Sequence, residues 1–380
     1  MSKKVNLKLK DEFINDEINN TINSDKLFIN YGYIENEDKY INGLYNYFNQ
    51  TKQNLLKNYS TIHFYLKNSE YINKYFDLLF LLSEKYNKID ILNLKQFNFT
   101  NETIIKLCDF LKLNKLEILE LNIFEISNEN LELLTETLKN NSSIKQLVLD
   151  YGRLNNDHYH ILTEQLKYNK SINDLVIEFS TYSYNDKYLY YISELLKYNT
   201  NIYNLIIKHT FENEELISLS EILTSSSIQY LKLYNCEIND DQFDVFYNSL
   251  KNNKTLIKLD LSWNNLTNKS YLKILEFLKD NKTLISLNLN GDKNTNMILF
   301  TEKLKEVMKF NNTLQVLKLG DDFFQKRVNH INSINNLLEM LKNNKSINKI
   351  KLPHHILNNK KYEKILLEVI NNKPDLKFYW

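Results

Sequence analysis

Residues Leu256–Leu266 read LIKLDLSWNNL, and the pattern of the first six residues recurs along the chain. The shared form is Ile/Leu-x-x-Leu-x-Leu or a close variant. It occurs at Ile89–Leu94, Leu116–Leu121, Ile144–Leu149, Ile172–Ile177, Ile202–Ile207, Ile228–Leu233, Leu256–Leu261, Leu284–Leu289, Leu314–Leu319 and Ile347–Leu352. Successive first positions are separated by 27, 28, 28, 30, 26, 28, 28, 30 and 33 residues. A near-constant period of this length indicates a solenoid, in which each repeat packs against its neighbours.

The copy that begins at Leu256 shows how one repeat is built. Leu259 and Leu261 alternate with Lys258 and Asp260, which is typical of a half-buried strand. Asn264 follows, and its side-chain amide can satisfy backbone groups where the chain leaves the sheet. The strand is therefore expected to end in a turn that is fastened by this asparagine.

A helix is predicted after each strand. Thr267 is suited to an N-cap, and Ser127 occupies the same place in an earlier repeat. An apolar helical face follows Thr267, made by Tyr271, Leu272, Ile274, Leu275 and Leu278. Lys279–Thr283 is then a polar return to the next strand. One strand and one helix per repeat make the strands parallel. Since helices are about 10 Å wide and strands are about 4.8 Å apart, the sheet should lie on a concave face.

The motif and its period resemble the leucine-rich repeat family, and are most similar to its ribonuclease-inhibitor-like subfamily. The resemblance covers roughly residues 59–380. It implies an α/β fold, a right-handed horseshoe-shaped solenoid with a parallel sheet on the concave face and helices on the convex face. The family has Asn or Cys at the ninth motif position, which Cys236 and Asn264 match. The first repeats depart from it, with Phe97, Phe124, Gly152 and Ser180, so their inner turns should differ.

The repeats are predicted to form one array over residues 58–380, with about eleven to twelve repeats and a C-terminal cap strand at Leu376, Phe378 and Trp380. Residues 1–57 are interpreted as an N-terminal cap with degenerate repeats, because the ends of an array need a polar-faced unit. A rival interpretation is a small adaptor module, such as an F-box that recruits a ubiquitin ligase. The proline-containing motif of that module is absent.

Composition limits the classes of partner. The formal net charge is +1 and 25% of residues are charged, which gives no general electrostatic footprint for nucleic acid or membrane. No stretch approaches the roughly 18 consecutive apolar residues that span a bilayer. Cys108 and Cys236 lie at core-like positions and form no disulfide framework. The first residues lack the apolar core of a signal peptide, so a cytoplasmic location is expected.

The motif also indicates which side chains face a partner. Its third, fifth and seventh positions should lie on the concave face, which places Val148, Val176 and Ile206 on consecutive strands. Contiguous apolar area with aromatic residues is typical of protein interfaces. The predicted contact residues are Val148, Tyr151, Val176, Phe179, Ile206, Tyr230, Lys232, Tyr234, Lys258 and Trp263. An alternative stays open: valine and isoleucine favour strands in any case, so the apolar residues can reflect strand propensity rather than a contact site.

Charge is unequal along the same face. The first half carries the carboxylates of Glu117, Glu120, Asp150, Asp174 and Glu178. The second half carries the lysines Lys232, Lys258, Lys318, Lys349 and Lys351.

The histidines do not suggest a metal site. His158 and His160 are two apart on a predicted helix and point to different faces, and His354 and His355 lack a Cys or carboxylate at metal-ligand spacing. No cofactor and no metal are expected, and the chain is not predicted to be an enzyme.

These observations favour a non-catalytic scaffold, a monomer that binds a protein partner on its concave face, with no nucleic-acid or membrane partner. Two alternatives remain: an adaptor of a ubiquitin ligase, and a GTPase-activating protein that uses Arg153. Some proteins that resemble this subfamily activate small GTPases, and such a role often employs an arginine against the nucleotide phosphates. Arg153 is one of only two arginines in the chain.

Overall fold

Every copy of the repeated motif forms a β-strand in a computed structural model of the chain. The structure describes residues 22–23, 26–30, 41–42, 44–46, 61–67, 72–86, 89–113, 115–151, 154–179, 187–211, 213–225, 227–290, 296–319, 331–352, 356 and 360–379. The chain divides into two compact units, Met1–Asn201 (unit 1) and Ile202–Trp380 (unit 2).

Unit 1 alternates strands with helices. In chain order its elements are β1 (Ile22–Asn23), β2 (Lys26–Asn30), β3 (Thr61–Lys67), α3 (Ile72–Tyr86), β4 (Ile91–Phe99), α4 (Asn101–Leu113), β5 (Ile118–Ile126), α5 (Asn128–Asn140), β6 (Gln146–Tyr151), α6 (Asn156–Leu166), β7 (Asp174–Phe179) and α7 (Tyr188–Tyr198). β1 and β2 are antiparallel, and from β2 to β7 each strand pairs in parallel with the next.

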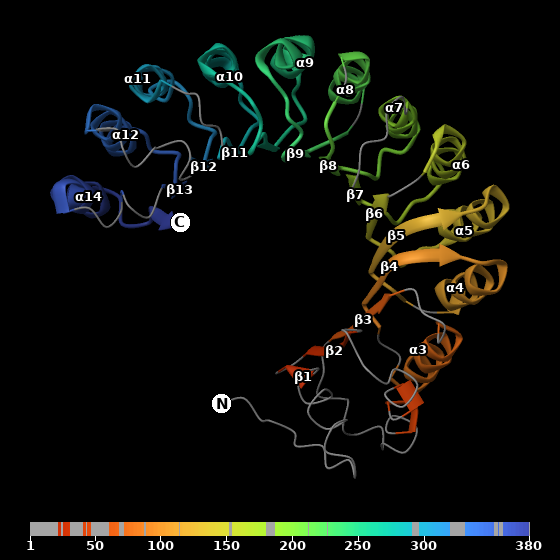
Figure 1. Cartoon of the computed structure of the whole chain (residues 1–380). Coiled ribbons are helices and arrows are strands. Elements are labelled where there is room, and N and C mark those ends of the chain that lie inside the picture. The colour runs from red at the N-terminus through yellow and green to blue at the C-terminus, as the bar shows by residue number, and fades with distance from the viewer. Residues whose placement is uncertain are drawn as a thin grey trace. The chain divides into compact units, whose positions relative to one another are not determined.

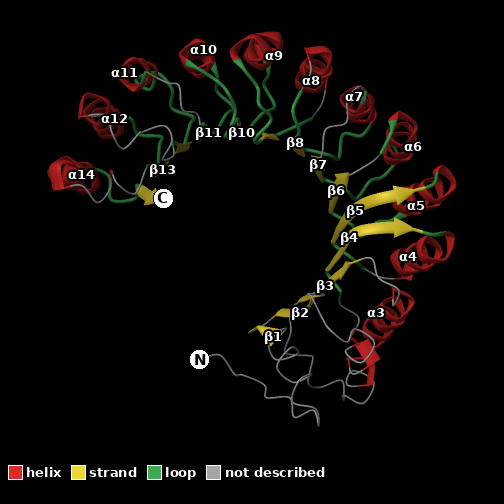
Figure 2. Ribbon diagram, in the orientation of Figure 1, coloured by secondary structure: helices red, strands yellow, loops and turns green. Residues whose placement is uncertain are grey.

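Unit 2 follows the same plan with shorter strands. Its elements are β8 (Asn204–Lys208), α8 (Asn213–Ser225), β9 (Tyr230–Leu233), α9 (Asp240–Asn252), β10 (Lys258–Asp260), α10 (Asn268–Asp280), β11 (Ser286–Asn288), α11 (Met297–Val307), β12 (Val316–Lys318), α12 (Ile331–Asn343), β13 (Lys349–Lys351), α14 (Lys360–Asn372) and β14 (Lys377–Tyr379). These strands pair in parallel in chain order. Within each unit the strands line one side and the helices the other (Figures 1 and 2).

The core lies between the sheet and the helices of each unit. Every residue at the fourth and sixth motif positions is at most 1% exposed. Full burial of a leucine side chain stabilises the fold by roughly 1.5–3 kcal/mol, and stacked neighbours supply that burial. The fold is therefore an α/β solenoid of leucine-rich-repeat type, as the motif predicts.

The predicted helix starts are confirmed where the structure describes them. The Ser127 side chain accepts a hydrogen bond from the Asn130 N–H, and the Thr267 side chain accepts one from the Lys269 N–H. Both bonds satisfy backbone donors that the first turn of a helix leaves free.

The inner turns of the two units differ, as the ninth motif position suggests. β4 and β5 each run for 9 residues and continue through Phe97 and Phe124. β10, β11, β12 and β13 each end after 3 residues. Gly152 and Ser180 lie outside the described residues.

The polar returns, which recur as Lys139–Asn141, Lys251–Asn253 and Lys342–Asn344, contain a row of asparagines whose structural role the sequence alone did not predict. An asparagine lies three residues before seven of the ten motif copies, at Asn141, Asn169, Asn199, Asn253, Asn281, Asn311 and Asn344. In each case its Oδ1 accepts the backbone N–H two residues later. Six of the seven also donate to a carbonyl of the preceding repeat. The constant offset from the motif is the signal that could have revealed them.

No helix in the described part of the chain is long and apolar enough to cross a membrane. Most of residues 1–57, the predicted cap, lies outside the described residues.

Candidate functional site

The unit 2 members of the predicted contact set come together on β8, β9 and β10 and on the turns that follow β9 and β10. Tyr230 pairs in register with Lys258, and Ile206 with Lys232. All four side chains are half-buried or exposed, on the face opposite the helices. The intervening Leu231 and its counterparts are fully buried. The period-2 pattern thus places an aromatic, an aliphatic and two basic side chains side by side on one open surface.

The lysines of this surface lie against its tyrosine rings. The Lys258 Nζ is 5.7 Å from the centroid of the Tyr230 ring, and the Lys232 Nζ is 5.0 Å from that of Tyr234. Such cation–π contacts hold a long side chain in place and are worth about 0.5–1 kcal/mol at exposed sites. They reduce the side-chain entropy that would be lost when a partner binds.

Burial changes two protonation equilibria near this surface. It raises the pKa of the Tyr230 hydroxyl, and the nearby Asp260 carboxylate adds to the effect. It also lowers the pKa of His209, which follows β8, to about 4. His209 is therefore neutral near pH 7, and lysines supply the positive charge of the surface.

Trp263 is the most exposed of the three aromatic residues that unit 2 contributes to the predicted contact set. Its side chain is 42% exposed, and its backbone has φ 61°, in the left-handed region. Asn235, one repeat earlier, has φ 54°. Asparagine adopts this conformation readily, whereas a bulky residue there is strained. The next repeat has Gly291 at the equivalent sequence position.

A buried amide beneath Trp263 fixes the turn. The Asn264 Nδ2 donates to the carbonyl oxygens of Leu233 and Leu261, at 2.8 Å in both cases. The Asn264 Oδ1 accepts the backbone N–H groups of Cys236 and Ile238, both at 3.1 Å. This confirms the role expected for Asn264 and explains how the turn tolerates a strained neighbour.

Cys236 belongs to the same buried turn. It is 1% exposed, and burial raises the pKa of its thiol to about 12. A thiol in this state is not a nucleophile near neutral pH, because the reactive form is the thiolate.

Polar residues continue the surface on β10 and β11. The Asp260 carboxylate accepts the Ser262 N–H at 2.9 Å and the Asn288 Nδ2 at 2.8 Å. Asp260 is buried and satisfied by these donors, so it is a structural acceptor rather than a free acid.

The unit 1 members of the predicted set lie on β6 and β7. Val148 pairs in register with Val176, and Tyr151 with Phe179. Val148 is half-buried, but Val176 is only 5% exposed and offers a partner little surface. The alternation pattern assigns both valines to the same face and does not reveal how far the neighbouring residues cover each of them. Tyr151 and Phe179 belong to strands, but their side chains lie outside the described part of the structure.

Among the residues that the structure describes, those with a possible role in catalysis or metal binding form no second site. His158 is buried, and its Nδ1 accepts the Asn155 N–H at 3.2 Å in a capping box, whereas His160 is exposed. Arg153, His354 and His355 lie outside the described residues. The described residues contain no group of three or more His, Cys, Asp or Glu side chains arranged to hold a metal ion.

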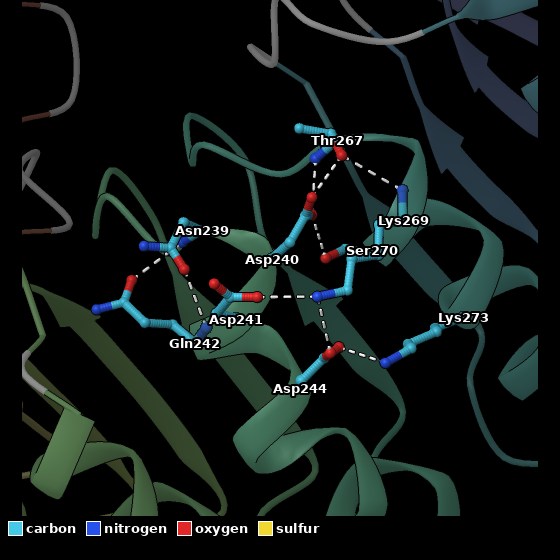
Figure 3. A network of polar contacts seen from close by, with 9 residues as sticks. All are labelled: Asn239, Asp240, Asp241, Gln242, Asp244, Thr267, Lys269, Ser270 and Lys273. Carbon is cyan, nitrogen blue, oxygen red and sulfur yellow. Dashed lines mark hydrogen bonds and ion pairs between the residues drawn. The ribbon is translucent and has the colours of Figure 1, made fainter.

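Figure 3 shows a polar network that joins the starts of α9 and α10. Asp240 accepts the Thr267 N–H at 2.9 Å, and hydroxyl hydrogen bonds from Thr267 and Ser270. Burial alone would raise the pKa of Asp240, but these hydrogen bonds outweigh it and lower the pKa below its usual range. The carboxylate of one repeat therefore caps the helix of the next.

Ion pairs extend this network along the helices. The Lys269 Nζ lies 2.8 Å from Asp241 and 3.1 Å from Asp244, and Lys273 also contacts Asp244. Every carboxylate in the cluster is engaged by a donor of the neighbouring repeat. The cluster is accordingly a fastening between repeats rather than a reactive site.

Comparisons with known proteins give structural likeness only. A scan against protein-family models finds no match, and a search of curated proteins finds none either. Among solved structures, the chain is similar to Rad7 in its complex with Elc1 from yeast, with TM-score 0.45 and 16% identity over 83% of this chain and 82% of that one. It is also similar to actin-binding site 2 of leiomodin-1, with TM-score 0.35 and 19% identity over 41% of this chain and 87% of that one. A third structure is the tropomodulin C-terminal domain of Caenorhabditis elegans, with TM-score 0.34 and 15% identity over 48% of this chain and 98% of that one.

Proposed function

We propose that the chain is a non-catalytic scaffold that binds a protein partner on the sheet face of its repeats. The observation that carries the proposal is Trp263, an exposed aromatic side chain held in a strained backbone conformation in the turn that follows β10. Strain of this kind persists only where the surrounding structure imposes it, and it clusters at functional sites. Tryptophan and tyrosine are also the residues that most often dominate binding energy at interfaces.

The chemistry around Trp263 supports binding rather than catalysis. Asp260 is saturated by hydrogen bonds, Cys236 is a buried thiol, and His209 is neutral at physiological pH. What the surface offers instead is aromatic area flanked by lysines that lie against tyrosine rings. Aromatic anchors with a polar rim are the usual composition of a protein interface.

Site-specific photo-crosslinking tests the proposal. A photo-reactive phenylalanine analogue replaces Trp263 in one variant, and Ile298 of α11, which is 48% exposed on the helix side, in a matched control. We expect a defined partner to crosslink at position 263 in native extract and not at position 298. Crosslinking at position 298 alone, or equally at both, would place the interface elsewhere.

The captured partner then allows a quantitative test with purified proteins. Tyr230→Ala together with Trp263→Ala should weaken its affinity by about thirtyfold or more, which corresponds to about 2 kcal/mol. Ile298→Ala together with Phe310→Ala removes exposed apolar area from the other side and should leave affinity unchanged. Equal affinity of the wild type and the Tyr230/Trp263 variant would contradict the proposal.

A further inference from the structure

Four lysines gather on the open face of the last three strands of unit 2. β12, β13 and β14 lie next to one another in the sheet (Figure 1). Lys318 pairs in register with Lys351, and Lys349 with Lys377. Lys349 and Lys377 are exposed, and Lys318 and Lys351 are half-buried. The alternation that buries Ile350 against the helices places the lysines on the opposite face.

Among the residues that the structure describes, no acidic side chain neutralises the positive charge of these four lysines. None of the four lysines forms an ion pair or a side-chain hydrogen bond with another described residue. On the helix side, by comparison, Lys305 pairs with Glu339 at 3.1 Å and Lys342 pairs with Glu368. Like charges directly opposite each other on neighbouring strands destabilise a sheet. The described residues therefore leave the repulsion within the cluster uncompensated, and an anionic partner would relieve it.

We propose that these four lysines bind an extended acidic segment of a protein. The inference rests on the proposed function and adds the chemical class of the partner. Lys349 and Lys351 are two residues apart on one strand, about 6.6 Å at the usual rise. Alternate side chains of an extended peptide have the same spacing, so carboxylates at every second residue match this pair.

The composition of the chain favours an acidic protein over a nucleic acid. The formal net charge is +1 and the chain has only two arginines. Nucleic-acid-binding domains usually carry a strongly basic surface and rely on arginine for phosphate contacts. The four lysines lie on the same face of the unit 2 sheet as Tyr230, which belongs to β9, and Trp263, which follows β10. One strand, β11, separates the lysines from this aromatic group. A partner with an apolar anchor and an acidic extension would cover both.

A binding titration on the full chain tests the inference. The probe is a fluorescent synthetic peptide of alternating glutamate and serine, at physiological ionic strength, with alternating glutamine and serine as the neutral peptide. The variant is Lys318→Gln, Lys349→Gln, Lys351→Gln and Lys377→Gln. The control is Lys254→Gln, Lys279→Gln, Lys309→Gln and Lys345→Gln, which removes the same charge from exposed positions on helices and return turns. Circular dichroism of both variants serves as the check that they are folded.

We expect the acidic peptide to bind the wild type and the control, and the sheet-face variant to bind at least about tenfold more weakly, as the loss of several exposed ion pairs implies. The affinity should fall as salt is added. No binding by the wild type, equal loss in both variants, or equal binding of the neutral peptide would overturn the inference. Tighter binding of a short single-stranded oligonucleotide would assign the surface to nucleic acid instead. The peptide test does not involve Tyr230 or Trp263, so its failure is distinguishable from failure of the proposed function.

Discussion

Trp263 occupies a place in its repeat where tryptophan is a poor choice for stability. Its φ of 61° lies in the left-handed region, where a residue with a Cβ atom costs roughly 1–2 kcal/mol. Asn235 takes the same conformation one repeat earlier, and asparagine adopts it with little strain. In the function proposed above, the side chain of Trp263 contributes to partner binding rather than to the stability of the fold.

Substituting Trp263 by glycine and by alanine distinguishes the energetic effect of backbone strain from that of losing the side-chain contacts. Trp263→Gly and Trp263→Ala both remove the ring, but only glycine relieves the left-handed strain. We expect the free energy of unfolding of the glycine variant, measured in urea, to exceed that of the alanine variant by about 0.5–1 kcal/mol. This difference is the relief of left-handed strain minus the larger conformational entropy that glycine has in the unfolded chain. Both variants should bind the partner equally weakly.

A helical position supplies the control for this comparison. Leu272 on α10 is 36% exposed, and there the order should reverse, with alanine more stable than glycine by about 1 kcal/mol. Alanine more stable than glycine at both positions would show that Trp263 is not strained.

The contact residues show what sequence can predict at this scale. The alternation of Lys258 and Leu259 correctly assigns the open face and the core. The alternation does not predict how exposed a residue on the open face is, since Val148 is half-buried and Val176 is 5% exposed. It depends on the neighbours that cover each position. The strain at Trp263 was not foreseen either, because φ depends on the geometry of the whole turn.

Within each repeat element, a buried asparagine can hold the return turn between a helix and the next strand. Asn311 is 0% exposed. Its Nδ2 donates to the Leu278 carbonyl oxygen at 2.7 Å, and its Oδ1 accepts the Leu314 N–H at 2.9 Å and the Thr313 N–H at 3.0 Å. Each bond satisfies a backbone group that the turn would otherwise leave unpaired. One amide thus joins the end of α10 to the residues that lead into β12, two repeats further along the chain.

Removing this amide should be costly. We expect Asn311→Ala to lower the free energy of unfolding by about 2–4 kcal/mol, because several buried backbone groups lose their partners. Asn312 is exposed beside it, and Asn312→Ala should change stability by less than about 0.5 kcal/mol. Urea unfolding monitored by circular dichroism measures both. Similar values for the two variants would show that the asparagine row contributes little.

The chain's composition obscured these asparagines in the sequence. Asn occurs throughout the chain, so Asn343 and Asn344 look alike, although Asn343 is exposed and Asn344 is 5% exposed. By contrast, the strands and helices themselves followed from local pattern, as the caps at Ser127 and Thr267 show. Local chemistry predicted elements well, and contacts between repeats poorly.

The division of the chain into two units is a property of the whole molecule, and the sequence motifs do not predict it. The repeated motif continues from unit 1 into unit 2 with a spacing of 30 residues between Ile172 and Ile202, within the range of the other repeats. The units differ in their inner turns, since β4 and β5 run on through Phe97 and Phe124 while unit 2 has the Asn264 amide. In a repeat protein, stability is approximately a sum of local terms, so unlike repeats can unfold at different denaturant concentrations.

Each unit contains one buried cysteine, and these thiols can report on the two units separately. Cys108 and Cys236 are each 1% exposed. Burial raises the pKa of both thiols, that of Cys236 to about 12, and it also keeps a labelling reagent from reaching either thiol in the folded protein. Unfolding returns the pKa to about 8.5, and the thiolate then forms. Pulsed thiol labelling in increasing urea, followed by mass spectrometry of the two peptides, measures the opening of each unit.

We expect Cys108 to become reactive at a lower urea concentration than Cys236, because the inner turns of β4 and β5 lack the buried amide that ties four backbone groups together around Cys236. Asn264→Ala should bring the labelling of Cys236 to lower urea and leave that of Cys108 unchanged. Single Cys108→Ser and Cys236→Ser variants assign each signal. If both thiols become reactive at one urea concentration, and Asn264→Ala shifts them together, the two units unfold as a single cooperative body.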